Sequence, residues 1–156
     1  MSGITILGAG LAGCEAALQC ARRGVPVTLI EQKPAARTPA HRYDGVSELC
    51  CSNSLRSGSH TNAVGLLKEE LAAMGSIVME AVAHTRVAAG GAVAVDRQRF
   101  SDYITDAVRS HPLITVVCAQ AAEILRGELV DENDGNAHLF RAVFAEHREN
   151  RLHDRV

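Results

Sequence analysis

Two adjacent cysteines stand out in the stretch ELCCSNSLRS, which runs from Glu48 to Ser57. A thiolate can act as a nucleophile or as a metal ligand, so Cys50 and Cys51 are open to either chemistry. A metal site needs further ligands, and no histidine or other cysteine follows at the short spacings of zinc motifs. We therefore predict no metal here, and either a nucleophile or a small buried side chain at each of the two positions.

Polar residues directly follow the cysteine pair. Asn53, Ser54 and Arg56 carry hydrogen-bond donors that suit carbonyl or phosphate oxygens of a ligand. The ordinary polarity of a surface loop explains them as well, so they are candidate substrate-binding residues. The remaining cysteines, Cys14, Cys20 and Cys118, fall in predicted regular elements, and we interpret them as packing residues.

A second motif lies near the N-terminus, where the sequence GAGLAG matches the G-x-G-x-x-G pattern of dinucleotide-binding proteins. In that pattern the first glycine allows a tight turn, the second lets the backbone approach a pyrophosphate, and the third permits close packing of helix on strand. The phosphates then lie at the positive end of the following helix. The candidate cofactor-binding residues are Gly8, Ala9, Gly10, Leu11, Ala12 and Gly13.

The elements around this motif complete the pattern. An apolar strand over Gly3–Leu7 precedes the glycines, an alanine-rich helix from Cys14 ends at Gly24, and a second strand over Val25–Glu31 ends in a carboxylate. That carboxylate, Glu31, would accept hydrogen bonds from ribose hydroxyls and disfavours a 2′-phosphate, so FAD or NAD is favoured over NADP. The sequence thus predicts a Rossmann-like βαβ unit.

Further elements extend the predicted α/β fold. A long loop follows Glu31, an amphipathic helix capped by Thr61 or Asn62 runs to Gly75, and a helix capped by Asp96 ends at His111. The apolar residues of the first helix recur at helical spacing, as Val64, Leu67, Leu71 and Met74. Residues Leu113–Ala119 are β-branched and predict a third strand of a growing parallel sheet.

Composition limits the function classes. The formal net charge of −2 gives no electrostatic argument for a nucleic-acid partner, and the aromatic share of 3% leaves few platforms for stacking bases. Five cysteines without a CxxC pair favour reduced thiols. No run approaches the length of a membrane span, so we expect no membrane association and a cytoplasmic location.

Several stretches together resemble one family. GAGLAGCEAA, TPAHRYDGVSELCCSNSLRS, TNAVGLLKEELAAMGSIVMEAV, AAGGAVAVDRQRFSDYIT and HPLITVV occur in unbroken order over roughly the first 120 residues. In this order they resemble the N-terminal portion of the bacterial folate- and FAD-dependent tRNA (uracil-5-)-methyltransferases, the TrmFO family. The combination of CSNSLR with TNAVGLLKEE is far more specific than a glycine loop alone.

The resemblance implies a definite chemistry. Methylenetetrahydrofolate would give its one-carbon unit through reduced FAD to C5 of a uridine in the T loop of tRNA, and NADH or NADPH would reduce the flavin. The family's active-site cysteine directly precedes Ser-Asn-Ser, which assigns the catalytic role to Cys51. A thiolate that adds at C6 of uracil makes C5 nucleophilic. Cys50 is expected to be a packing residue.

Two alternatives stay open. A related flavoprotein family that modifies the wobble uridine of tRNA, long called the glucose-inhibited division protein, shares the AGCEAA opening, and the chain could also be an inactive nucleotide-binding fragment. We divide the chain into an FAD-binding region over residues 1–120 and a divergent charged tail over residues 121–156, either helical or poorly ordered. The family pattern does not continue in the tail, so we expect an incomplete fold with weak or no flavin retention.

Overall fold

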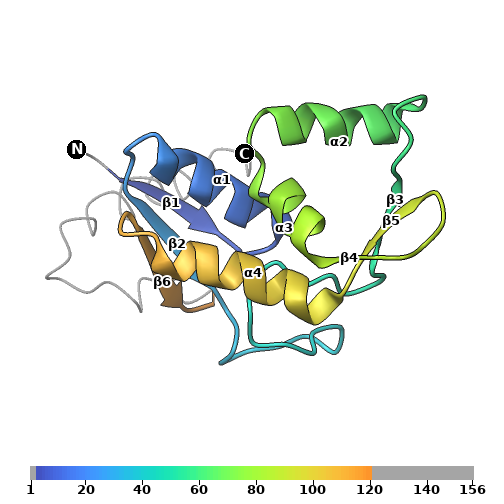
Figure 1. Cartoon of the computed structure of the whole chain (residues 1–156). Coiled ribbons are helices and arrows are strands. Elements are labelled where there is room, and N and C mark those ends of the chain that lie inside the picture. The colour runs from blue at the N-terminus through green and yellow to red at the C-terminus, as the bar shows by residue number, and fades with distance from the viewer. Residues whose placement is uncertain (1–2, 121–156) are drawn as a thin grey trace, which may run out of the picture.

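The computed structural model of the chain describes residues 3–120 (Figure 1). The predicted tail over residues 121–156 lies outside the described residues, and the proposed division of the chain therefore stays a prediction. No helix in the described part is long and apolar enough to cross a bilayer.

The main sheet has three parallel strands in the order β1-β2-β6, with β1 over Ile4–Leu7, β2 over Val27–Glu31 and β6 over Ile114–Cys118. Helix α1, Leu11–Arg22, connects the first two strands. The register pairs Leu7 with Ile30 and Glu31 with Cys118, so the carboxyl ends of all three strands meet at one edge of the sheet. The predicted βαβ unit and third parallel strand are confirmed.

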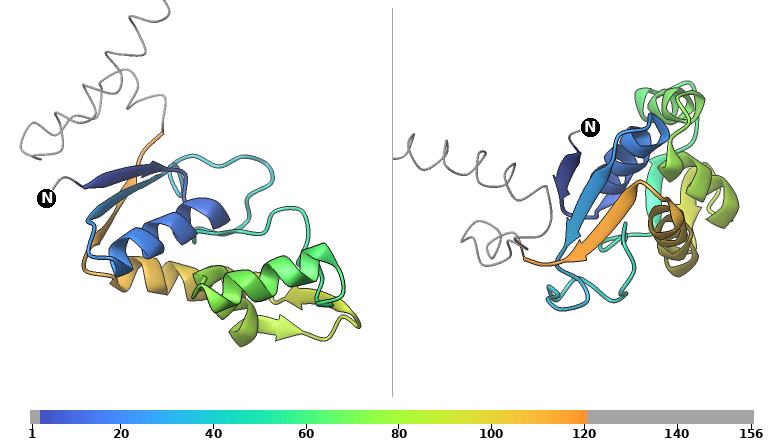
Figure 2. Two further views of the ribbon diagram at one scale, coloured as in Figure 1. Left: turned by 90° about the horizontal axis from the view of Figure 1, so that it is seen from above. Right: turned by 90° about the vertical axis from the view of Figure 1, so that its left-hand side faces the viewer.

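Two helices cover one face of this sheet. Helix α4, Arg97–Ser110, lies beside α1 on that face (Figure 2). The predicted cap is confirmed, because the Asp96 carboxylate accepts a hydrogen bond from the Arg99 N–H at 3.0 Å. Phe100, Ile104 and Val108 of α4 are fully buried and form the centre of the core with Leu29 and Cys14.

A small antiparallel sheet lies beyond the N-terminal end of α4. It has the order β3-β5-β4, with β3 over Ser54–Ser57, β4 over Arg86–Val87 and β5 over Ala92–Val95. We had expected Ser54 and Arg56 to lie in a loop, and this expectation was wrong. Ser54 pairs with Ala94 of β5, forty positions later, which local sequence patterns cannot reveal.

The segment between β3 and β4 forms two helices, α2 over Ala63–Ala73 and α3 over Ile77–Thr85. Asn62 caps α2 as predicted, accepting the Gly65 N–H at 2.9 Å. The expected apolar stripe, however, is not buried: Leu67 is 54% exposed and Met74 is 65% exposed. Helix α3, which was not predicted, packs against α4 and α1 instead.

The contrast between α4 and α2 gives a stability prediction. Replacing Ile104 by Ala should lower the free energy of unfolding by about 2–5 kcal/mol, because the side chain is fully buried. Leu67→Ala, the same kind of truncation on exposed α2, should cost no more than about 0.5 kcal/mol. Urea unfolding followed by circular dichroism measures both, and equal losses would contradict the packing described here.

Candidate functional site

The glycine turn between β1 and α1 has the geometry that each glycine requires. Gly8 has φ +90°, a left-handed conformation that only glycine adopts without strain. A Cβ at Gly13 would lie 1.9 Å from the Gly8 carbonyl oxygen, so the helix can approach the strand only without a side chain there. A Cβ at Gly10 would meet nothing within 4 Å. The turn therefore has open space in front of its second glycine.

That open space faces the start of α1. Gly10 is the N-cap of the helix and offers no side-chain acceptor to the N–H groups of the first turn. Such groups at a helix N-terminus, with the positive end of the helix dipole behind them, form a binding site for phosphate. The exposed residues of the turn, Gly8, Gly10 and Ala12, leave this site accessible, while Ala9 is buried.

The carboxylate of Glu31 lies beside the turn, as predicted. Its Oε2 accepts the Ala9 N–H at 2.8 Å, and its Oε1 accepts the Lys33 N–H at 3.0 Å. Each carboxylate oxygen keeps a further lone pair that could accept a ribose hydroxyl. Glu31 also has a structural role that the sequence did not reveal: its carboxylate holds the glycine turn to the chain that follows β2.

Lys33 continues this connection into the cysteine loop, the segment 41–53 that contains Cys50 and Cys51. The Lys33 ammonium group lies 3.1 Å from Oε2 of Glu48 and donates to the Gly45 carbonyl oxygen at 2.6 Å. The side chains of Lys33 and Glu48 are 3% and 2% exposed. Burial alone would raise the pKa of Glu48, but hydrogen bonds from the Arg42 N–H and Lys33 outweigh it and lower the pKa. The Glu48 carboxyl group is therefore ionised at neutral pH.

Further contacts hold the cysteine loop between α4 and the glycine turn. Ser101 donates to the Val46 carbonyl oxygen at 2.7 Å, and the Thr105 hydroxyl accepts the Val46 N–H at 2.9 Å. The Ser47 N–H donates to the Ala9 carbonyl oxygen at 2.8 Å. Ser47 itself has φ +52°, a strained conformation for a residue with a side chain. The loop thus contacts the turn directly at Ser47, four residues before Cys51.

Cys51 is exposed and lines a hollow of about 610 Å³. Of the predicted substrate-binding residues only Asn53 lines it too, whereas Ser54 and Arg56 do not. Arg56 has φ +67°, and its N–H bonds the Ser54 hydroxyl at 3.1 Å, so both residues shape β3 locally. Sequence reasoning missed the rest of the lining, which comes from the loop, the small sheet and the start of α4: Tyr43, Ser52, Val87, Val95, Asp96, Arg97 and Gln98.

The other cysteines differ in their surroundings. Cys14 is fully buried and its thiol bonds the Ala9 carbonyl oxygen at 3.3 Å. Burial raises its pKa to about 11, which leaves it a protonated packing residue, as interpreted. The interpretation of Cys118 as a packing residue was wrong: it is exposed at the end of β6.

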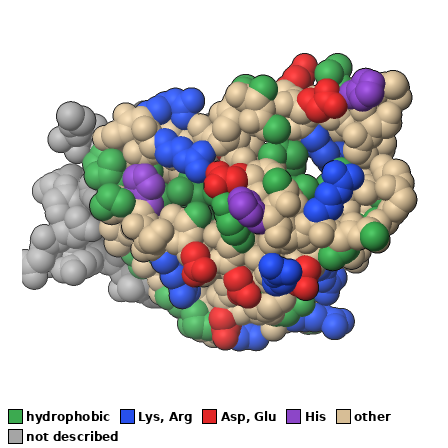
Figure 3. Space-filling view, in the orientation of Figure 1, with side chains coloured by type: hydrophobic (Ala, Val, Ile, Leu, Met, Phe, Trp, Pro, Cys, Tyr) green, Lys and Arg blue, Asp and Glu red, His purple; other side chains and the backbone are tan. Residues whose placement is uncertain are grey.

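The molecular surface carries mixed charges. On the face shown in Figure 3, blue and red side chains alternate without forming a patch of one sign. This agrees with the small formal net charge of −2. Recognition of a polyanion by this face would depend on particular side chains and not on a strong overall field.

Comparison with known proteins identifies the family of this chain. The family model "Glucose inhibited division protein A" matches residues 3–143. A Pelobacter propionicus protein named methylenetetrahydrofolate–tRNA-(uracil-5-)-methyltransferase TrmFO is 66% identical over 114 residues, which are 73% of this chain and 25% of that protein. A protein of the same name from Lactococcus lactis subsp. cremoris is 52% identical over 126 residues, 81% of this chain and 28% of that protein.

A solved structure supports the fold. The chain superposes on GidA of Aquifex aeolicus with a TM-score of 0.60 and 17% identity, over 76% of this chain and 19% of that one. The chain spans only about a quarter of the length of the curated relatives described above. The resemblance to TrmFO and the Rossmann-like α/β fold are both confirmed, and the chain belongs to the glucose-inhibited division protein A family, with close relatives among the TrmFO proteins.

Proposed function

We propose that this chain supplies the FAD-binding turn and the nucleophilic cysteine of a folate-dependent tRNA (uracil-5-)-methyltransferase that acts on a T-loop uridine. The observation that carries the proposal is the direct contact of the two loops, in which the Ser47 N–H bonds the Ala9 carbonyl oxygen at 2.8 Å. This contact brings the segment leading to Cys51 against the nucleotide turn. The identity of 66% to a relative named TrmFO favours this reaction over wobble-uridine modification.

The glycine turn fits FAD. Open space at Gly10 and uncapped N–H groups at the start of α1 would accept the pyrophosphate, and Glu31 would accept the ribose hydroxyls. The Glu31 carboxylate would repel a 2′-phosphate, which argues against NADP in this turn. When bound, FAD would supply the reducing equivalents that convert a methylene group into a methyl group, with methylenetetrahydrofolate and NAD(P)H as co-substrates.

The hollow fits a nucleobase. Cys51 offers an exposed thiol whose thiolate would add at C6 of uracil and raise the electron density at C5. Asn53, Arg97 and Gln98 line the same hollow and carry donors for the two uracil carbonyls. In this scheme the protein recognises the tRNA through a uridine base that has left the base stack, and not through a basic surface. A cytoplasmic location goes with a tRNA substrate and remains a prediction.

Gly10 gives a test of the nucleotide site that does not depend on folding. Gly10→Val should lower the free energy of unfolding by no more than about 1 kcal/mol, because valine is a poorer helix N-cap than glycine but a Cβ there meets no protein atom and the φ of −75° suits any residue. The same side chain would fill the space of the pyrophosphate, and we expect affinity for ADP to fall by at least about tenfold, or 1.4 kcal/mol. Titration calorimetry with the full chain measures this loss.

Gly91→Val is the matched control for this test. Gly91 also has no atom within 4 Å of its missing Cβ, but it lies in the turn before β5, away from the glycine motif. This variant should bind ADP like the wild type. Equal ADP affinity in Gly10→Val and Gly91→Val would contradict the assignment of the nucleotide site to the glycine turn.

Cys51 is tested in a chimera, because the chain matches 25% of its Pelobacter propionicus relative. Residues 3–120 of this chain replace the matching segment of that protein, and 5-methyluridine is measured in tRNA from a bacterium that lacks this modification. The chimera should restore 5-methyluridine, and Cys51→Ser should abolish it. Cys50→Ser should retain it. Undiminished modification in the Cys51→Ser chimera would remove this thiol from the reaction.

A further inference from the structure

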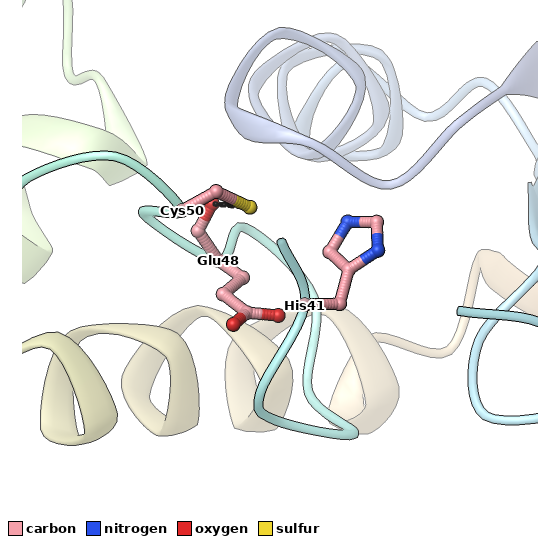
Figure 4. A group of neighbouring side chains, drawn as sticks. All are labelled: His41, Glu48 and Cys50. Atoms are coloured by element: carbon pink, nitrogen blue, oxygen red, sulfur yellow. Dashed lines mark hydrogen bonds between the residues drawn. The ribbon is translucent and has the colours of Figure 1, made fainter. Parts of the chain in front are cut away.

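The proposed function leaves one cluster of reactive side chains without a task. His41, Glu48 and Cys50 come together in the cysteine loop, although they are spread over ten positions of the sequence. Their potential ligand atoms all lie within 4.8 Å of one another; His41 and Cys50 are half-buried residues, and the side chain of Glu48 is buried. Figure 4 shows the Cys50 sulfur, the Glu48 carboxylate and the His41 ring grouped beneath the glycine turn.

We propose that His41, Glu48 and Cys50 form a binding site for a divalent cation of the zinc class. Imidazole nitrogen, thiolate sulfur and carboxylate oxygen are the three ligand types that Zn²⁺ takes in proteins, and a sulfur ligand disfavours Mg²⁺ and Ca²⁺. Tetrahedral zinc with bonds of about 2.0–2.3 Å separates its ligand atoms by roughly 3.4–3.6 Å. Small side-chain rotations that move the ligand atoms by about an ångström would bring the observed spacing to that value.

Each ligand atom has capacity left for a cation. Nδ1 of His41 lies 3.2 Å from the Thr38 N–H and 3.1 Å from its hydroxyl, while Nε2 makes no hydrogen bond to any residue in the range 3–120. For Nε2 to bind a metal, the ring proton must lie on Nδ1, which then donates to the Thr38 hydroxyl as the second-shell contact, and the contact with the Thr38 N–H is given up. The Cys50 thiol makes only a long contact of 3.7 Å to the Glu48 carbonyl oxygen.

Glu48 is already ionised and anchored, which prepares it as a ligand. Its Oε1 accepts the Arg42 N–H at 2.6 Å and its Oε2 lies 3.1 Å from Lys33, but a carboxylate offers about four lone-pair positions. Lys33 would stay bound to Oε2 and to the Gly45 carbonyl oxygen. On binding, Cys50 releases its thiol proton to solvent as the sulfur–metal bond forms, so no oxidant or reductant is involved.

The site changes the interpretation of the two adjacent cysteines. The sequence predicted no metal, because the segment lacks the short fixed ligand spacings of known zinc motifs, and the family resemblance implied a packing role for Cys50. The fold instead brings His41 and Glu48 to Cys50 through a loop closed by Lys33. Three protein ligands leave one coordination position to water, and Cys51, which lines the separate hollow, remains the free thiol.

Alkylation of Cys50 tests the proposal at the site itself, which separates it from metal bound by His138, His147 and His153 outside the described residues. The reduced, metal-free full chain carrying Cys51→Ser is treated with iodoacetamide, with and without Zn²⁺, and Cys50 modification is measured by peptide mass spectrometry. Saturating Zn²⁺ should slow alkylation of Cys50 at least about tenfold, as expected for occupancy above nine-tenths. Alkylation of Cys20 in the same sample should not change.

Histidine variants decide whether the protection comes from this cluster. His41→Ala should abolish the protection of Cys50, and His60→Ala, on an exposed histidine elsewhere, should keep it. His41→Asn is the second variant, because its Oδ1 can still accept the Thr38 N–H while it lacks the ring nitrogen that faces the site. Its thermal unfolding should match the wild type. Unprotected Cys50 in the Cys51→Ser chain with His41 intact, or full protection in either His41 variant, would overturn the proposal.

Discussion

The buried ion pair of Lys33 with Glu48 is the interaction on which the candidate site depends. Lys33 lies two residues after Glu31, whose carboxylate binds the backbone of Ala9 in the glycine turn, and Glu48 lies three residues before Cys51. Two carboxylates and one lysine therefore connect the glycine turn to the segment that carries a thiol through a few hydrogen bonds. Removing one partner of such a pair leaves an uncompensated buried charge, which typically costs about 3–5 kcal/mol.

The same network explains how an irregular segment of about twenty residues can hold a defined shape. A loop without strand or helix partners must satisfy its backbone groups in other ways. Here α4 supplies the Ser101 and Thr105 hydroxyls, Lys33 supplies its ammonium group, and Arg37 pairs with Asp44 at the surface. The loop is thereby fixed on rigid elements, as a site that must orient a thiol requires.

Local patterns in the sequence predicted the conformation of the glycine turn but only part of the structure of the cysteine loop. GAGLAG with Glu31 is a compact pattern whose geometry follows from neighbouring residues, and the Asp96 cap of α4 is equally local. The pairing of β3 with β5, the approach of His41 to Cys50 and the role of Lys33 arise from contacts between distant positions. Helical periodicity predicted α2, but it could not show that Leu67 would remain exposed.

We infer that the glycine turn and the cysteine loop act as one unit joined through Glu31 and Lys33. Hydrogen–deuterium exchange of the chain with and without FAD tests it most directly. Binding should slow exchange in residues 8–13 and also in residues 42–48, which touch the turn through Ser47 and Lys33. Slower exchange in the turn alone, with residues 42–48 unchanged, would contradict the account.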